Sequence, residues 1–198
     1  MRGLVRVGAA VPSLALGNVK ENMKRHLAMM REAKEKHVSI VTFPELSLTG
    51  YTCGDLFFQR RLLDDVTDAL LTLKDEMPEK IIAVVGAPLE IEGALYNCAV
   101  VLHKGEIISA VPKTFLPNNG EFYEKRWFQS GDARGDIWAA IPKLKTDVCR
   151  QAIFETEDGV RFGIELCEDL WAPLPPSTML SVEGAEIILN LSASNELL

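Results

Sequence analysis

Residues 18–45, NVKENMKRHLAMMREAKEKHVSIVTFPE, decide how the chain folds. Asn18 precedes Glu21 by three residues, which is the spacing of a capping box at the start of a helix. The apolar side chains that follow recur at the spacing of one helix face, at Val19, Met23, Leu27, Met30 and Ala33. The sequence therefore predicts an amphipathic helix in this stretch.

A strand is expected directly after this helix. His37 closes the helical pattern, and residues 38–43 are rich in β-branched side chains, which favours a short buried strand that stops at Pro44. Arg6 interrupts the apolar N-terminal run, so residues 4–7 fit a buried first strand better than a targeting segment. The opening of the chain is therefore predicted to be a β-α-β unit.

The rest of the chain adds helices, hairpins and one long loop. A second helix is expected over 62–77, where Pro78 ends it, and a third strand over 81–85. Paired apolar runs around short turns are typical of antiparallel hairpins and predict a mixed sheet: 97–102 with 106–111, and 152–155 with 160–166. The remaining expectations are a long loop over 112–146, a helix after 173–176 and a buried strand over 186–191.

Composition narrows the class of protein. The 198 residues fit one domain, 1–198, and the hydrophobic and charged fractions of 47% and 25% are those of a folded globular chain. The net charge of −7 disfavours nucleic acid and anionic membrane surfaces as partners, and no apolar stretch is long enough to cross a bilayer. Four cysteines without a CxxC pair are expected to be reduced thiols, which predicts a cytoplasmic protein.

Three reactive side chains each follow a predicted strand: Glu45, Lys113 and Cys167. Taken singly, they fit a surface acid, a solvated lysine and a structural buried cysteine equally well or better. Taken together they could form a nucleophilic site. A thiol needs a base or a cation to become nucleophilic at neutral pH, a glutamate can take its proton, and an ammonium can stabilise both the thiolate and an oxyanion.

The histidines give no support to other site chemistries. His26 and His37 lie in the first predicted helix and at its end, and His103 lies in a hairpin turn. A Cys-His pair of the papain type and a metal site are therefore not expected.

The order Glu45, Lys113, Cys167 resembles the Glu-Lys-Cys triad of the nitrilase, or carbon-nitrogen hydrolase, superfamily. Longer motifs resemble the glutaminase domain of the glutamine-dependent NAD synthetase family, over essentially the whole chain. These motifs are FPELSLTGY (43–51), KTFLPN (113–118), EFYE (121–124), CEDLW (167–171) and NLSAS (190–194).

The resemblance implies a role for each matching residue. Glu45 would be the general base and then the acid, Lys113 would stabilise the thiolate and the oxyanion, and Cys167 would be the nucleophile that forms a glutamyl thioester. Glu121 matches the second glutamate that relatives place beside the triad. Ser194 would hold the α-amino and carboxylate end of glutamine, and Trp171 would be a pocket wall; the alternatives for these three are a loop carboxylate, a cap and a core aromatic.

The resemblance also implies a fold and partners. The expected fold is the α/β, four-layer α-β-β-α sandwich of the nitrilase superfamily, truncated at its C-terminus. L-glutamine is the expected substrate, the synthetase domain of a longer chain is the expected ammonia acceptor, and a homo-oligomer is expected. No cofactor or metal is expected in these residues, since ATP and magnesium would belong to the synthetase domain.

Two departures and two alternatives accompany this interpretation. Asn119 stands where the family commonly has a tyrosine, which puts a substrate contact in doubt, and the chain looks like an N-terminal fragment. One alternative is a stand-alone carbon-nitrogen hydrolase acting on another amide or a nitrile. The other is an inert scaffold or assembly fragment, in which missing strands leave sheet edges exposed.

Overall fold

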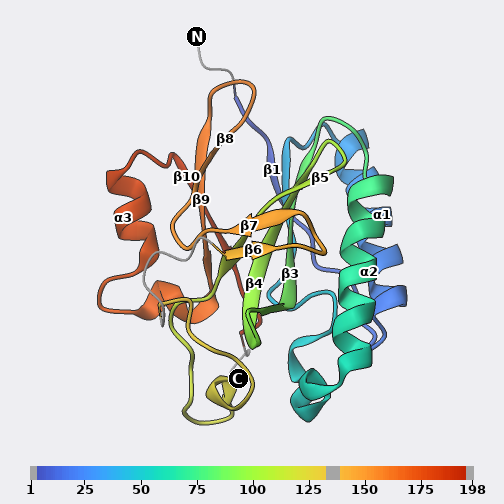
Figure 1. Ribbon diagram of the computed structural model, residues 1–198. Helices are drawn as coiled ribbons and strands as arrows, with labels where there is room; N and C mark the ends of the chain where they lie inside the picture. The colour runs from blue at the N-terminus through green and yellow to red at the C-terminus, as the bar shows by residue number, and fades with distance from the viewer. Residues whose placement is uncertain (1–3, 133–138, 195–198) are drawn as a thin grey trace, which may run out of the picture.

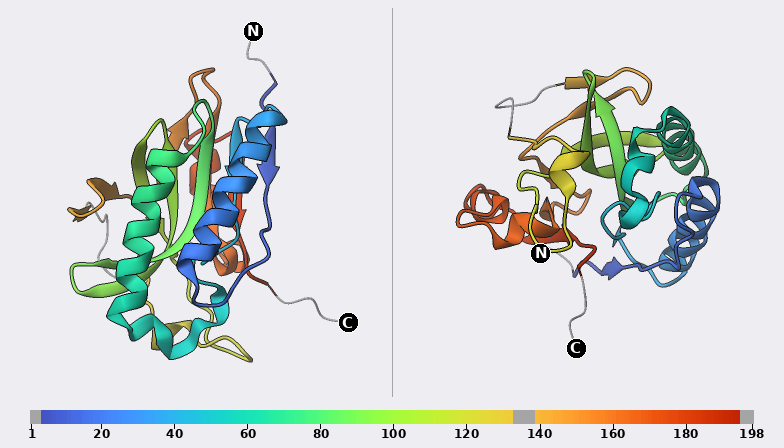
Figure 2. Two further views of the ribbon diagram at one scale, coloured as in Figure 1. Left: turned by 90° about the vertical axis from the view of Figure 1, so that its right-hand side faces the viewer. Right: turned by 90° about the horizontal axis from the view of Figure 1, so that it is seen from below.

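Two β-sheets lie face to face between helices in the computed structural model, which describes residues 4–132 and 139–194 (Figure 1). Helices α1 (Val19–Glu35) and α2 (Arg60–Glu76) lie side by side and cover the outer face of the larger sheet, as Figure 2 also shows. Helix α3 (Pro176–Val182) lies beyond the smaller sheet. This order of layers confirms the predicted α-β-β-α architecture.

The larger sheet has the strand order β1-β2-β3-β4-β5-β7-β6. β1, β2 and β3 pair in parallel, whereas β3, β4 and β5 pair antiparallel, so the sheet is mixed as predicted. β5 thus runs in the direction of β2, and the two strands end at the same end of the sheet. The bounds are Val7–Ala9 (β1), Ile40–Thr42 (β2), Ile82–Ile91 (β3), Ala94–His103 (β4), Glu106–Pro112 (β5), Ala139–Ile141 (β6) and Thr146–Val148 (β7).

The smaller sheet has the order β10-β9-β8. β8 (Ile153–Glu155) and β9 (Arg161–Leu166) form the predicted hairpin, and β10 (Ile187–Leu191) returns through α3 to pair in parallel with β9. α3 packs closely on β9, because a Cβ at Gly163 would lie 2.9 Å from the Leu180 side chain. β9 and β10 therefore end at the same end of this sheet.

Two apolar cores hold the layers together. One lies between the larger sheet and helices α1 and α2, and the other lies between the two sheets. β3 serves both, because its side chains alternate: Ala83 and Val85 contribute to the helix-side core, and Val84 to the core between the sheets. Phe162 and Ile164 of the smaller sheet belong to that second core together with Val84.

Three details differ from the sequence-based expectation. The first strand covers Val7–Ala9 rather than 4–7, and it is half exposed because it lies at the sheet edge. β3 continues past Gly86 and Pro88 to Ile91, since pairing along the whole of β4 outweighs two residues that usually interrupt strands. The expected loop 112–146 contains the 3-10 helix η2 (Glu124–Arg126) and the short hairpin β6–β7, and part of it, 133–138, lies outside the described residues.

Within the described part of the chain, every helix is too short or too polar to cross a membrane.

Candidate active site

The three predicted catalytic residues follow strands that end at a common place. Glu45 follows β2, Lys113 directly follows β5, and Cys167 directly follows β9 of the other sheet. The Lys113 Nζ lies 2.6 Å from Glu45 Oε1, and both side chains are fully buried. The sequence-based pairing of Glu45 with Lys113 is therefore present in the structure as a buried ion pair.

The second glutamate beside Lys113 is Glu124, and the expectation that placed Glu121 there is wrong. Lys113 Nζ donates to Glu124 Oε1 at 2.7 Å, and Tyr51 donates its hydroxyl to the same oxygen at 2.6 Å. Glu121 is exposed, whereas Glu124 is buried. The reason is local: the chain turns through η2, which carries Glu124 inward after three residues that include the exposed Tyr123.

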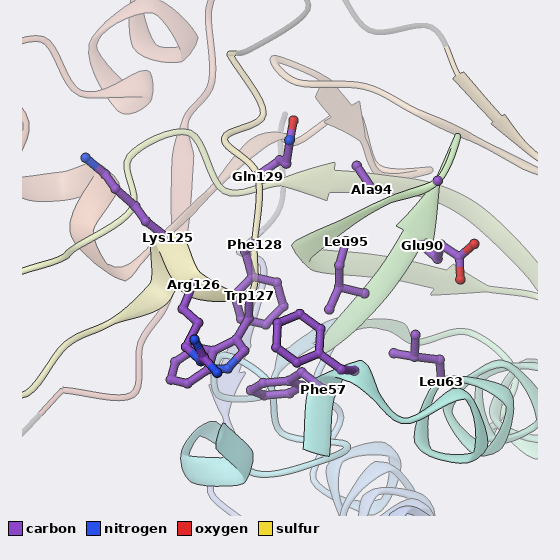
Figure 3. A pocket seen from close by; sticks show the side chains of 12 residues that line it. Phe57, Leu63, Glu90, Ala94, Leu95, Lys125, Arg126, Trp127, Phe128 and Gln129 are labelled. Atoms are coloured by element: carbon purple, nitrogen blue, oxygen red, sulfur yellow. The ribbon is translucent and has the colours of Figure 1, made fainter. Parts of the chain in front are cut away.

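The segment that follows Glu124 is anchored by aromatic contacts, whose residues are drawn in Figure 3, and by an ion pair. Phe57 of the 3-10 helix η1 (Tyr51–Phe58) packs against Trp127 and Phe128, with ring centroids 5.9 and 4.9 Å apart. Asp55 accepts two hydrogen bonds from Arg126 at 2.7 and 2.8 Å. The three aromatic residues and Arg126 line a cavity of about 400 Å³, and their contacts fix the backbone that presents Glu124 to Lys113.

Electrostatics keep Lys113 charged. Burial alone would lower the pKa of Lys113, but Glu45 and Glu124 outweigh it, so the pKa lies above its usual value. Burial raises the pKa of Glu124; the Lys113 charge opposes this, and the Glu45 charge adds to it. The arrangement is a buried ammonium shared between two buried carboxylates.

Two further groups hold the Glu45 carboxylate. Asn97 on β4 donates its Nδ2 to Glu45 Oε1 at 2.7 Å, and the Ala193 backbone N donates to Oε2 at 3.2 Å. The backbone carbonyl of Asn97 also accepts the Lys113 backbone N–H at 2.8 Å. The carboxylate is thus held by donors from both sheets.

Cys167 occupies a sharp turn between β9 and the 3-10 helix η3 (Cys167–Trp171). Its φ of 42° lies in the left-handed region that non-glycine residues rarely adopt, which is typical of strained functional positions. The Sγ atom lies 3.6 Å from Ser194 Oγ. Burial raises the pKa of Cys167, Glu45 adds to this, and Lys113 opposes it, so the thiol needs a base to take its proton.

Asp169 ties the Lys113 segment to the Cys167 turn. Its carboxylate accepts the backbone N–H groups of Thr114 and Phe115 at 3.0 and 2.7 Å, and that of Leu166 at 3.1 Å. Burial raises the pKa of Asp169 to about 6 while these donors oppose the shift, so the group is ionised at pH 7. This one side chain fixes the loop after β5 relative to the loop after β9.

The predicted substrate contacts lie in two places. Ser194 lies beside the Cys167 sulfur, as described above. Trp171 is largely exposed and lines a hollow of about 470 Å³, together with Thr114 and Glu168, the chain neighbours of Lys113 and Cys167. Asn119, where the family commonly has tyrosine, is exposed.

The buried histidine His26 has two hydrogen-bond partners. His26 is buried between the Asn22 carbonyl and the Ser47 hydroxyl, at 2.7 and 2.9 Å, and burial lowers its pKa to about 4. Among residues 4–132 and 139–194, no three His, Cys, Asp or Glu side chains form a group able to hold a metal ion.

Sequence reasoning missed Glu124 and Asn97. Glu124 was visible only as the last letter of the EFYE motif, in a loop without periodicity that could show which glutamate turns inward. Asn97 was assigned only to a strand, and its role depends on the register of β4 against β5, which pairs Cys98 with Pro112.

Comparison with known proteins gives the family of the chain. The carbon-nitrogen hydrolase family matches residues 6–197, and the chain belongs to this family of enzymes. Glutamine-dependent NAD(+) synthetases are among its relatives: the Mycobacterium tuberculosis protein is 39% identical over 97% of the chain, and the Thermotoga maritima protein is 30% identical over 96%. The chain spans only 29 and 30% of the length of these relatives.

Solved structures show the same fold. A glutamine-dependent NAD(+) synthetase from Cytophaga hutchinsonii superposes with a TM-score of 0.82 at 29% identity, covering 96% of this chain and 30% of that one. An amidase from Nesterenkonia sp. superposes with a TM-score of 0.76 at 17% identity, covering 97% of this chain and 66% of that one. The nitrilase-superfamily fold predicted from the sequence is thereby confirmed.

Proposed function

We propose that this chain hydrolyses the side-chain amide of L-glutamine through a covalent thioester on Cys167. One observation carries the proposal: a buried ammonium, Lys113, is held by Glu45 and Glu124 beside a cysteine on left-handed backbone. A nucleophile, a base and a cation at one place are what acyl transfer from nitrogen to sulfur requires.

The first half of the reaction forms the thioester. Glu45 takes the Cys167 proton as the sulfur attacks the amide carbon, and the carbonyl oxygen becomes an oxyanion. Glu45 and Glu124 occupy two of the three N–H bonds of Lys113, and the third serves this oxyanion. The carbon–nitrogen bond then breaks, Glu45 returns its proton to the nitrogen, and ammonia leaves.

The second half releases the acid. A water molecule gives a proton to Glu45 and attacks the thioester carbon, with Lys113 again stabilising the oxyanion. The carbon–sulfur bond breaks, the carboxylic acid leaves, and the sulfur regains its proton from Glu45. The net change is addition of one water to one amide, giving one acid and one ammonia.

Two features favour an amide substrate and glutamine in particular. Glu124 Oε2 is buried and has no hydrogen-bond partner among the described residues, so it can accept an N–H of a bound amide. The hollow beside Trp171 is lined by Lys125 and by Glu168 and Asp132, which can pair with an α-carboxylate and an α-amino group. The relatives are named for their dependence on glutamine.

We further propose that the ammonia serves a synthetase domain that amidates nicotinic acid adenine dinucleotide, as the names of the relatives imply. ATP and magnesium would act at that domain. A purified chain of these 198 residues is then expected to hydrolyse glutamine without producing NAD from the deamido dinucleotide, ATP and ammonia.

Covalent labelling tests the proposed hydrolysis. The chain is incubated with a diazoketone analogue of glutamine, its intact mass is measured, and the modified peptide is sequenced, with Cys167→Ala as control. A single adduct on Cys167 that excess glutamine blocks is the expected result. Turnover of simple amides or nitriles, with neither labelling nor turnover of glutamine, would instead support a stand-alone hydrolase of another substrate.

A further inference from the structure

We propose that Asn97 is a positioning residue, which fixes the Glu45 carboxylate so that one defined oxygen serves as the base. This inference rests on the hydrolytic function proposed above and adds a residue to it. Asn97 is fully buried on β4, between β3 and β5, and lies on neither of the segments that carry Lys113 and Cys167.

Hydrogen bonding to the two carboxylate oxygens of Glu45 is unequal. Oε1 receives two short bonds, from Lys113 Nζ at 2.6 Å and from Asn97 Nδ2 at 2.7 Å, which use both of its lone pairs. Oε2 receives one longer bond, from the Ala193 backbone at 3.2 Å, and keeps a lone pair. The proton of the thiol is therefore taken by Oε2, and Asn97 closes Oε1 to it.

The direction of Oε2 fits this assignment. Its donor Ala193 precedes Ser194, whose hydroxyl lies 3.6 Å from the Cys167 sulfur. Without the Asn97 amide, only Lys113 would hold Oε1, and Lys113 is shared with Glu124. Asn97 thus removes the rotational freedom that would exchange the two oxygens.

The neutrality of the Asn97 donor also matters. The charged or titratable groups around Glu45 are Lys113 after β5, Glu124 of η2, Cys167 of η3 and, through Glu124, Tyr51 of η1. An added cation would weaken Glu45 as a base, and an added carboxylate would repel it. An amide supplies an N–H donor without changing the count of one ammonium and two carboxylates.

The experiment compares Asn97→Leu and Asn97→Asp with the unsubstituted chain. The rate of iodoacetamide alkylation of Cys167 is followed against pH by peptide mapping, and kcat and KM are measured for glutamine. Ser109→Ala is the matched control, because it removes the hydrogen bond of another buried side chain in the same sheet, to the Asp147 carbonyl at 3.1 Å.

Loss of the amide donor destabilises the charged form of Glu45 and strengthens its affinity for the thiol proton, so the midpoint of the alkylation profile should move to lower pH, by about one unit, in Asn97→Leu. In Asn97→Asp, which conserves size, the midpoint should move to higher pH instead, because the added negative charge opposes formation of the thiolate. For Asn97→Leu, kcat should fall by about tenfold, as expected for a general base that is no longer held in position, while KM changes by less than about threefold. Ser109→Ala should leave the profile unshifted.

An unshifted alkylation midpoint in both Asn97 variants overturns the proposal, whether or not activity falls. A purely structural role of Asn97 would lower only the amplitude of the alkylation profile and the melting temperature. Failure of the hydrolytic function is seen separately, as absence of glutamine turnover in the unsubstituted chain. The alkylation profile still decides the role of Asn97 in that case.

Discussion

At the scale of single residues, the site is built around the buried charge of Lys113. Removing an ion from water costs several kcal/mol, which paired charges and hydrogen bonds must offset. Glu45 and Glu124 supply these partners to Lys113 at 2.6 and 2.7 Å. Each carboxylate therefore both supports folding and sets the chemistry of the ammonium.

Substitution of the two candidate second glutamates separates their roles. Glu124→Gln leaves Lys113 with one carboxylate and removes the acceptor for the amide, so kcat/KM for glutamine should fall at least about tenfold and stability by about 2–4 kcal/mol. Glu121 is exposed, so Glu121→Gln should change kcat/KM for glutamine by less than about twofold and the free energy of unfolding by less than about 0.5 kcal/mol. Steady-state ammonia release and urea unfolding measure these effects.

The reverse pattern, with Glu121→Gln inactive and Glu124→Gln active, would show that the buried ion pair is structural and that the loop rearranges around substrate.

The sequence allowed some of these residues to be predicted. Glu45, Lys113 and Cys167 follow strands whose apolar patterns are easy to recognise, and their position after a strand is independent of packing details. Glu124 and Asn97 could not be predicted, because the inward turn of η2 and the register of β4 depend on contacts between segments far apart in the chain. The roles assigned to Ser194 and Trp171 stay predictions.

At the scale of elements, the loop after β2 is shaped by close contact with β3. Leu46 has a φ of 50°, and its backbone N and the Pro44 carbonyl face Gly86. The Leu48 backbone N donates to the Gly86 carbonyl at 3.1 Å. The glycine that made the sequence pattern of β3 look shorter is the residue that lets the Glu45 loop approach the sheet.

A methyl group at this position should displace the loop. In Gly86→Ala, the new Cβ would lie 2.3 Å from the Pro44 carbonyl oxygen and 2.4 Å from the Leu46 N, both backbone atoms that cannot swing away. Stability should fall by about 2–3 kcal/mol and the alkylation rate of Cys167 should change with it. Urea unfolding and peptide mapping provide the two measurements.

Gly8→Ala is the control, since its Cβ would lie 3.3 Å from a Val38 side-chain methyl at the sheet edge and should cost less than about 1 kcal/mol. Equal effects of the two substitutions would contradict the special role of Gly86.

At the scale of the whole molecule, the site depends on both sheets. Glu45, Asn97 and Lys113 belong to the larger sheet, and Cys167 and Ala193 follow strands of the smaller one. The helices and hairpins could be predicted from their regular patterns, and the layered fold from the resemblance of the motifs to a known family. The strands β6 and β7, with three residues each, are too short to show a pattern. The homo-oligomer and the cytoplasmic location stay predictions.

Asp169→Asn should loosen the connection between the sheets. The amide can keep the bonds from Thr114 and Phe115 through its oxygen, but its NH₂ group would then face the Leu166 N–H, which also donates. Stability should fall by about 1–3 kcal/mol, and glutamine hydrolysis by more than this loss of folded protein explains. Asp147→Asn, at an exposed position on β7, is the control.

Thermal unfolding measures the loss of stability. Ammonia release, measured at a temperature where both variants are folded, gives the loss of glutamine hydrolysis. Full activity in Asp169→Asn would show that the core between the sheets alone aligns Lys113 with Cys167.

The division of the site between two sheets has a consequence for the folding pathway. Helices α1 and α2 can pack on the larger sheet, and β8, β9 and α3 can associate, without bringing Cys167 near Glu45. Cys167 should thus become reactive toward a glutamine analogue only in the last step of folding, when the two sheets dock. Refolding followed by pulses of a glutamine analogue would then report the final assembly step, at a time when circular dichroism is already complete.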